Sequence, residues 1–130
     1  MMDNKHSLGW IGMCRMGYPM AERLVKAGNS VSIWNRTRSK AEPLAQKGAT
    51  LVDRPADLAG VDVLFTMVST GSDLEHVYFG PDGVVSGANG KLPKIFVDCS
   101  SIALEESEDI RARLAEQGSQ FIAAPVSGNG

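Results

Sequence analysis

The sequence has few of the features that mark membrane or nucleic-acid-binding proteins. No apolar run approaches the roughly 20 residues that cross a bilayer, and residues 1–7 are polar, unlike a signal sequence. There are 13 basic and 15 acidic residues, so the net charge of −2 gives no global field to attract nucleic acid or a membrane surface. The composition predicts a cytoplasmic protein without nucleic-acid or membrane partners.

Cysteine is equally scarce. The two cysteines, Cys14 and Cys99, do not have a spacing that binds a metal. In a cytosolic protein such residues are more often free thiols than partners in a disulfide. We therefore expect neither a metal site nor a cross-link.

What the sequence does contain is a regular alternation of apolar and amphipathic segments. Its 130 residues, 43% of them apolar, are enough for one globular domain. Short apolar runs predict six strands, near residues 8–11, 30–34, 50–52, 61–68, 95–98 and 120–123. Amphipathic segments between them predict helices, the last of which opens at Ser100 or Ser101 and closes at Gly118. This pattern is typical of an α/β protein whose parallel sheet has helices on both faces.

The turn after the first expected strand resembles a phosphate-binding turn. Gly12, Cys14 and Gly17 stand at the first, third and sixth positions, where the dinucleotide-binding pattern has glycine. Glycine lets a pyrophosphate approach backbone N–H groups at a helix N-terminus. Met13, Arg15 and Met16 complete the turn. Because Cys14 places a side chain where the middle glycine would be, we expect weakened or shifted cofactor binding.

The residues after the second expected strand favour NADP over NAD. NAD-binding domains have an acidic residue here, which holds the ribose hydroxyls, whereas this chain has Asn35. Arg36 and Thr37 add a planar cation and a hydroxyl, which suit phosphate oxygens. A solvated basic loop is the alternative interpretation, and the preceding glycine turn disfavours it.

Polar residues also follow the other expected strands. Val68 and Ser69 end the fourth strand, Ser100 and Ser101 follow the fifth, and Ser127 follows the sixth. Ligands of parallel sheets bind outside the carboxyl ends of the strands, so one crevice can gather these residues. Ser100 or Ser101 could instead be a helix N-cap, and the two roles can coexist.

Together these residues resemble the N-terminal cofactor domain of the β-hydroxyacid dehydrogenase family, which includes 3-hydroxyisobutyrate and tartronate semialdehyde dehydrogenases. The motifs that carry the resemblance are Gly9-Trp10-Ile11-Gly12, Met16-Gly17-Tyr18-Pro19-Met20-Ala21, Val25-Lys26-Ala27-Gly28, Trp34-Asn35-Arg36-Thr37, Lys40-Ala41, Asp98-Cys99-Ser100-Ser101-Ile102 and Ala124-Pro125-Val126-Ser127-Gly128. The resemblance implies a doubly wound six-stranded Rossmann sheet in the order 3-2-1-4-5-6. It also implies hydride transfer between NADP(H) and a small 3-hydroxy acid or its semialdehyde.

The resemblance also implies roles for individual residues. The turn from Gly12 to Gly17 would bind the pyrophosphate. The adenosine end would lie on Asn35, Arg36 and Thr37, and the rest of the cofactor would run along Val68, Ser69 and Ser101. The substrate-binding residues would be Ser100, Ser127 and Gly128, which would hold a small carboxylate. Asp73 stands where some members of the family have asparagine.

Two parts of the family's pattern are missing from these residues. The family's general acid/base is a lysine on a helix beyond Gly130, and its all-helical domain, which closes the substrate pocket and makes the dimer, also lies beyond that point. We therefore expect residues 1–130 to be the dinucleotide-binding domain of a longer homo-oligomeric protein, or a truncated product of its gene. No catalytic residue is predicted here, and we expect the domain alone to be inactive.

Two other functions are compatible with the sequence. Imine reductases have a cofactor domain similar around Trp34-Asn35-Arg36-Thr37, although Asp98-Cys99-Ser100-Ser101 favours the hydroxyacid branch. A non-catalytic NADP-binding or interaction module would account for Cys14 and for the missing lysine.

Overall fold

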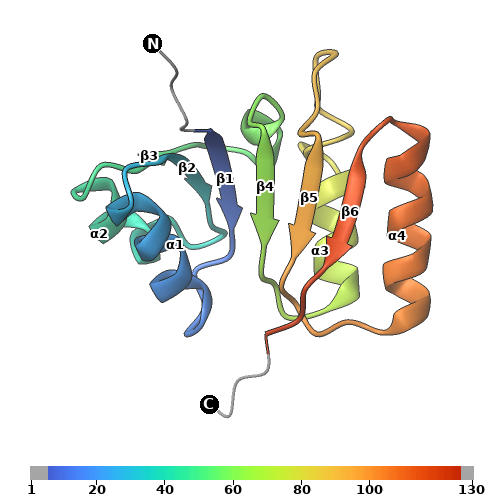
Figure 1. Ribbon diagram of the computed structural model, residues 1–130, viewed down its shortest axis with the longest axis horizontal. Coiled ribbons are helices and arrows are strands. Elements are labelled where there is room, and N and C mark those ends of the chain that lie inside the picture. Colours follow the sequence, from blue (N-terminus) through green and yellow to red (C-terminus); the bar gives the residue numbers. More distant parts are fainter. Residues whose placement is uncertain (1–5, 127–130) are drawn as a thin grey trace.

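Six parallel strands form one sheet in the order β3-β2-β1-β4-β5-β6 (Figure 1). The computed structural model describes residues 6–126. The strands are β1 Ser7–Ile11, β2 Ser30–Trp34, β3 Thr50–Leu51, β4 Val63–Thr66, β5 Ile95–Asp98 and β6 Gln120–Ala123. The helices are α1 Gly17–Lys26, α2 Glu42–Ala45, α3 Gly71–Phe79 and α4 Leu104–Glu116, with short 3-10 turns η1 Arg38–Lys40 and η2 Pro55–Leu58. This confirms the predicted strand order and fold class.

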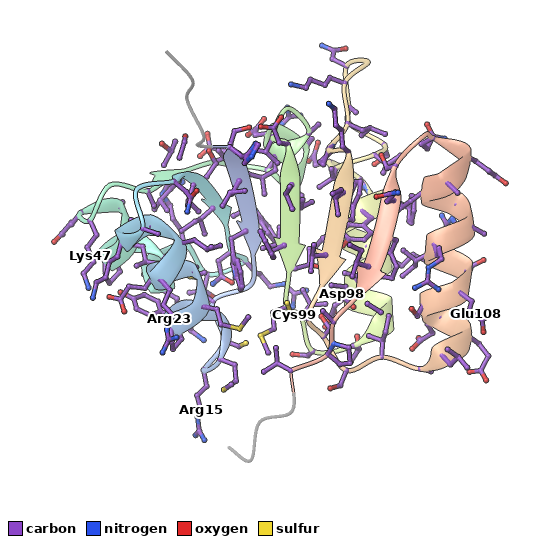
Figure 2. The ribbon with its side chains drawn as sticks, viewed as in Figure 1. Arg15, Arg23, Lys47, Asp98, Cys99 and Glu108 are labelled. Carbon is purple, nitrogen blue, oxygen red and sulfur yellow. The ribbon has the colours of Figure 1, made fainter. Side chains whose placement is uncertain are left out.

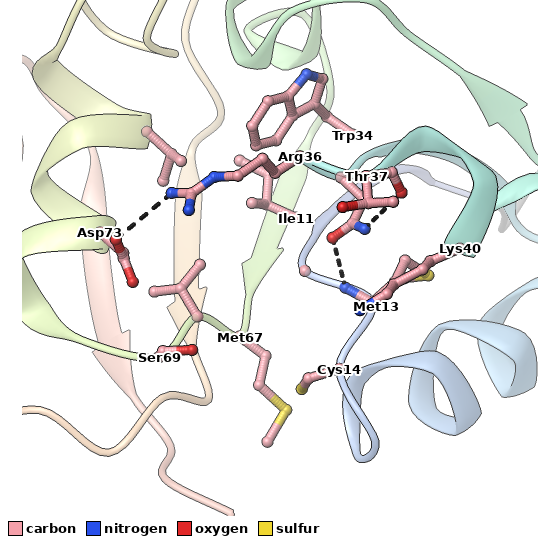
Figure 3. A pocket seen from close by; sticks show the side chains of 14 residues that line it. Ile11, Met13, Cys14, Trp34, Arg36, Thr37, Lys40, Met67, Ser69 and Asp73 are labelled. Atoms are coloured by element: carbon pink, nitrogen blue, oxygen red, sulfur yellow. Dashed lines mark hydrogen bonds and ion pairs between the residues drawn. The ribbon is translucent and has the colours of Figure 1, made fainter.

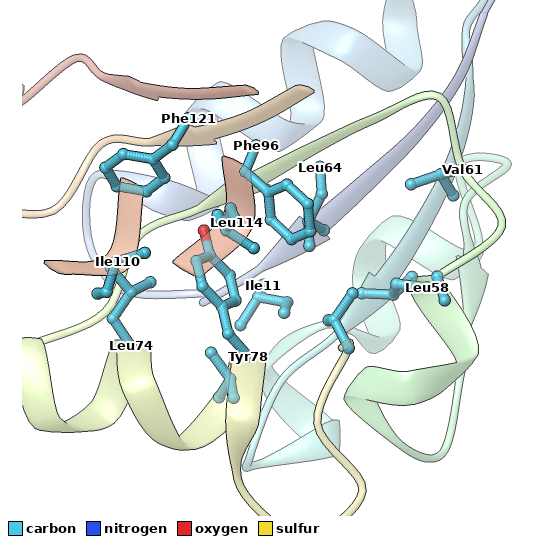
Figure 4. Close-up of a cluster of buried hydrophobic side chains, with 13 residues drawn as sticks. Ile11, Leu58, Val61, Leu64, Leu74, Tyr78, Phe96, Ile110, Leu114 and Phe121 are labelled. Carbon is cyan, nitrogen blue, oxygen red and sulfur yellow. The ribbon is translucent and has the colours of Figure 1, made fainter. Parts of the chain in front are cut away.

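The sheet has a hydrophobic core on each of its two faces. On one face α1 and α2 pack on β1–β3, where Trp10 and Ile33 meet Ala21 and Leu44. On the other face α3 and α4 pack on β4–β6. The side chains of this second core include Leu64, Leu74, Tyr78, Phe96, Ile110, Leu114 and Phe121 (Figure 4). Helices therefore cover both faces, as the alternating sequence pattern predicts, but each pair covers its own half.

The last helix begins later than the sequence predicts. Its N-cap is Ala103, so the prediction that Ser100 or Ser101 caps it is wrong. The Ser100 hydroxyl turns inward to Asp98, and the Glu106 side chain accepts from the Ala103 N–H at 3.0 Å instead. No helix within residues 6–126 is long and apolar enough to cross a membrane.

The strand order places a crevice at the carboxyl ends of β1 and β4. β1 pairs with β2 on one side and with β4 on the other, and the chain reaches them by crossovers on opposite faces of the sheet. The loops that leave β1 and β4 therefore diverge. In doubly wound sheets this is the point where ligands bind.

Candidate functional site

A pocket lies at this point, between the loops that follow β1, β2 and β4 (Figure 3). Its lining is Ile11, Gly12, Met13, Cys14, Trp34, Asn35, Arg36, Thr37, Lys40, Met67, Val68, Ser69, Asp73 and Val77. Eight of the predicted cofactor residues are among them: Gly12, Met13, Cys14, Asn35, Arg36, Thr37, Val68 and Ser69. Arg15, Met16, Gly17 and Ser101 lie outside this lining, and Ser127 and Gly128 fall outside the described residues.

At two positions of the turn, Gly12 and Gly17, a side chain would overlap backbone atoms. Gly12 has φ +108°, and a Cβ there would overlap the Met67 carbonyl oxygen and lie 2.9 Å from the carbonyl carbon. A Cβ on Gly17 would overlap the carbonyl oxygen of Gly12. Both glycines are therefore required by the close approach of backbone to backbone.

Backbone N–H groups of the turn remain free to bind an anion. Met13 N–H donates to Asn35 Oδ1 at 2.9 Å, and Gly17 N–H donates to Cys14 Sγ at 3.4 Å. Within the part of the chain that the structure describes, the N–H groups of Cys14, Arg15 and Met16 have no partner. They precede α1, whose first turn contains no acidic residue. The dipole of this helix therefore favours an anion at the turn.

Cys14 stands at the position where the pattern has its middle glycine, and its side chain protrudes from the turn. The residue is exposed and lines the pocket, and the Met67 side chain points toward it from the chain just beyond β4 (Figure 3). Its sulfur accepts the Gly17 N–H and thereby occupies one donor that a pyrophosphate could use. The other N–H groups of the turn can bind a pyrophosphate, and the Cys14 thiol would crowd it there.

Asn35 joins the glycine turn to the loop after β2. Its Oδ1 accepts from Met13 N–H, and its Nδ2 donates to the Thr37 carbonyl oxygen at 2.8 Å. An aspartate could keep the first bond but could not donate the second. The amide therefore shapes the loop that carries Arg36 and Thr37.

Charged side chains line the pocket from two sides, the loop after β2 and the start of α3. The charged lining residues are Arg36, Lys40 and Asp73. Arg36 reaches across the pocket to α3, where its Nη2 lies 3.5 Å from Asp73 Oδ1. Arg38 belongs with Arg36 and Lys40 to a basic run of the sequence, but it pairs with Asp53 at 3.2 Å and does not line the pocket.

A buried polar network lies where β4 and β5 end, around Asp98, the last residue of β5, which Figure 2 labels. Asp98 is 1% exposed, and its Oδ1 accepts from Thr66 Oγ1 at 3.0 Å and from Ser100 Oγ at 2.7 Å. Ser100 Oγ also accepts the Val68 N–H at 2.8 Å, and the hydroxyls of Thr66 and Tyr78 are 2.8 Å apart. Asp98 Oδ2 has no partner among the described residues. The network fixes Val68 at the edge of the pocket and holds the Ser100 hydroxyl inside the protein.

Burial raises the pKa of Asp98 above its ordinary value, although the hydrogen bonds from Ser100 and Thr66 act in the opposite direction. The folded state therefore binds this proton more tightly than the unfolded state. The stabilisation that results is complete below the unfolded pKa of about 3.9 and is lost as the pH rises through the raised pKa of the folded state.

We expect the replacement Asp98→Asn to remove this pH dependence, because asparagine does not titrate. The free energy of unfolding of the wild type, minus that of the variant, should fall as the pH rises from about 4 to about 7. Urea unfolding of both proteins at several pH values measures this difference. A difference that stays level or increases with pH would contradict the raised pKa.

From the sequence, Trp34 and Asp73 were named only as positions of the family pattern and were not assigned to the pocket, and the internal role of Asp98 was not predicted. Asp98 was visible only as a motif residue, because its partners Thr66 and Tyr78 come from other elements. The sequence offered one signal of this role, because the apolar run that forms β5 ends in the acid Asp98. Lys47 hydrogen-bonds to Glu22, which raises the pKa of that lysine and disfavours a role for it as a general base. Within the described residues, no three His, Cys, Asp or Glu side chains gather closely enough to hold a metal ion.

The sheet order, the glycine turn before α1 and the crevice beside it define a dinucleotide-binding domain of the Rossmann class. The chain belongs to the family described as the NAD binding domain of 6-phosphogluconate dehydrogenase, which matches residues 7–130. It is an NAD(P)-binding domain of the kind found in oxidoreductases.

Known relatives support the predicted resemblance to hydroxyacid dehydrogenases. Glyoxylate/succinic semialdehyde reductase 2, a chloroplastic protein of Arabidopsis thaliana, is 37% identical over 124 residues, which are 95% of this chain and 34% of that protein. The structure of Psf3 in complex with NADP+ and 2-OPP is 34% identical with a TM-score of 0.83, covering 93% of this chain and 43% of that one. The 3-hydroxyisobutyrate dehydrogenase of Mycobacterium tuberculosis, solved with L-serine, is 28% identical with a TM-score of 0.84, covering 95% and 41%. The chain spans less than half the length of each of these proteins.

Proposed function

We propose that this chain is the NADP(H)-binding domain of an oxidoreductase that transfers hydride between NADP(H) and a small 3-hydroxy acid or its semialdehyde. The proposal rests on the part of the pocket lined by the chain after β2. Arg36, Thr37 and Lys40 line it, and the residue that directly follows β2 is Asn35 and not an acid. A 2′-phosphate requires cations and hydroxyls there, and an acid would repel it. The similarity to Psf3, which was solved with NADP+, supports the choice of cofactor.

The residues present fit this cofactor in two places. The N–H groups of Cys14, Arg15 and Met16 would hold the pyrophosphate, while Arg36 and Lys40 would hold the 2′-phosphate. The nicotinamide ring supplies the hydride chemistry when bound. The protein's own part is to orient the cofactor along Val68 and Ser69, at the edge that Ser100 and Asp98 fix.

We further propose that the domain acts within a longer cytoplasmic homo-oligomer, in which other residues complete the substrate site. The supporting observation is that relatives such as 3-hydroxyisobutyrate dehydrogenase are more than twice as long as the part this chain matches. On this proposal Ser127 and Gly128 contact a carboxylate substrate, as Ser100 was also expected to do from the resemblance. The Ser100 hydroxyl faces inward to Asp98 and the Val68 N–H, so its part is to hold the edge of the pocket. The general acid/base comes from residues outside this domain, and the isolated domain has no catalytic activity.

Titration of the domain with NADPH and with NADH tests the proposed cofactor. Nicotinamide fluorescence should show saturable binding of both, with NADPH bound at least about tenfold more tightly, which corresponds to about 1.4 kcal/mol. Equal affinities would contradict NADP specificity. The absence of saturable binding would instead favour a module that has the fold but does not use the cofactor.

We expect Cys14→Gly to tighten NADPH binding by about tenfold, since it removes a side chain from the approach to the pyrophosphate and frees the Gly17 N–H. Cys14→Ser is the matched control, because it keeps a Cβ and a hydrogen-bond acceptor and should give little gain. The same fluorescence titration measures all three proteins. An unchanged affinity in the glycine variant would show that the thiol does not obstruct the site.

A further inference from the structure

We propose that Asp73 sets how strongly this domain prefers NADP to NAD, because its carboxylate competes with the 2′-phosphate for Arg36. The inference rests on the proposed function, since it assumes that Arg36 binds that phosphate. It adds Asp73, which lies on α3 across the pocket from the loop after β2, as a residue that lowers the preference for NADP over NAD.

Asp73 lies beside Arg36, the cation that would neutralise the 2′-phosphate of NADP. Arg36 extends from the loop after β2 over the pocket, and its guanidinium ends beside the carboxylate of Asp73 at 3.5 Å (Figure 3). Both residues line the pocket. A phosphate that binds Nη2 of this guanidinium therefore competes with Asp73 for it.

The backbone of Asp73 is fixed at the start of α3, whereas the exposed Arg36 side chain is free to exchange partners. The Asp73 N–H donates to Oγ1 of Thr70, the N-cap of α3, at 3.0 Å. Its carboxylate lies in the first turn of that helix, where the dipole favours a negative charge. The Arg36 side chain is 74% exposed, so water and ions reach the pair and hold its strength at the low level of surface ion pairs. A phosphate can displace Asp73 from Arg36, but the carboxylate then remains close to the bound phosphate.

The charges decide the sign of the effect. Arg36 and Lys40 give the pocket lining two positive charges, and Asp73 cancels one. A phosphate monoester carries about −1.5 to −2 charges at neutral pH, so the carboxylate weakens its attraction to the site. The 2′-hydroxyl of NAD is uncharged and can donate a hydrogen bond to a carboxylate. Asp73 therefore penalises NADP and not NAD.

The test compares Asp73→Asn with the wild type, and Asp53→Asn serves as the matched control. Asp53 forms the same kind of exposed pair with Arg38, but neither residue lines the pocket. Calorimetry gives the Kd of NADP+ and of NAD+ for each protein in low and high salt, and circular dichroism confirms that each variant is folded.

In low salt, Asp73→Asn should tighten NADP+ binding by about three- to tenfold and change NAD+ binding by less than about twofold. The gain should shrink in about 0.5 M salt, because the interaction is between exposed charges. Asp53→Asn should leave both constants within about twofold of the wild type.

The wild-type ratio of the two constants tests the proposed function, and the change of that ratio in Asp73→Asn tests this inference. A wild type that prefers NADP+, with an unchanged ratio in the variant, would overturn the inference alone. Weaker NADP+ binding by the variant would also overturn it, because Asp73 would then be holding Arg36 in position for the phosphate. A gain of the same size in Asp53→Asn would show a general charge effect and overturn it as well.

Discussion

Gly12→Ala is expected to destabilise the domain by about 3 kcal/mol, the sum of a strained backbone and an overlap with neighbouring atoms. Gly12 has φ +108°, which side-chain-bearing residues rarely adopt, and the added Cβ would overlap the Met67 carbonyl oxygen. This oxygen belongs to the main chain just beyond β4, so it cannot move aside as a flexible side chain would. The turn would have to separate from β4, and NADPH binding should be lost with it.

Gly60→Ala is the matched control for this change. A Cβ on Gly60 would meet no atom within 4 Å, and its φ is not in the left-handed region. Its effect should stay within about 0.5 kcal/mol, as for ordinary surface substitutions. Urea unfolding measures both variants. Equal effects in the two would show that the turn does not require glycine at residue 12.

Arg36→Ala is expected to weaken NADPH binding by about 10- to 100-fold, the range for loss of a hydrogen bond to a charged group. NADH binding should change by less than about threefold, because the 2′-hydroxyl carries no charge for the guanidinium to neutralise. Fluorescence titration of both nucleotides gives the two constants.

Arg38→Ala is the control, since Arg38 belongs to the same basic run but pairs with Asp53 outside the pocket lining. Its NADPH affinity should remain within about twofold of the wild type at moderate salt, where distant exposed charges are screened. If Arg36→Ala weakened NADPH and NADH equally, Arg36 would be acting on a part common to both nucleotides, and it would not read the 2′-phosphate.

The fold could be predicted because its signals are local. Short apolar runs and the amphipathic segments between them follow directly from which side chains face the two cores. The ends of elements were less predictable. Val61 and Met67 are buried and extend the apolar run of β4, yet they lie beyond the sheet pairing of Val63–Thr66. Burial alone does not distinguish a strand from the buried chain at its ends.

The pocket was predictable where its residues directly follow a strand, as Cys14, Arg36 and Ser69 do. Pairings between elements were not predictable. Thr66 meets Asp98 only through the register of β4 against β5, and Arg36 meets Asp73 only because α3 faces the loop after β2. These contacts depend on the three-dimensional packing of elements, which spacing along the chain does not encode.

A crystal structure of the domain with NADP+ tests the central claim most directly. We predict the pyrophosphate on the turn from Gly12 to Gly17 and the 2′-phosphate within hydrogen-bond distance of the Arg36 guanidinium, with the Asp73 pair broken. A nucleotide bound elsewhere, or one whose 2′-phosphate projects into solvent away from Arg36, would contradict it.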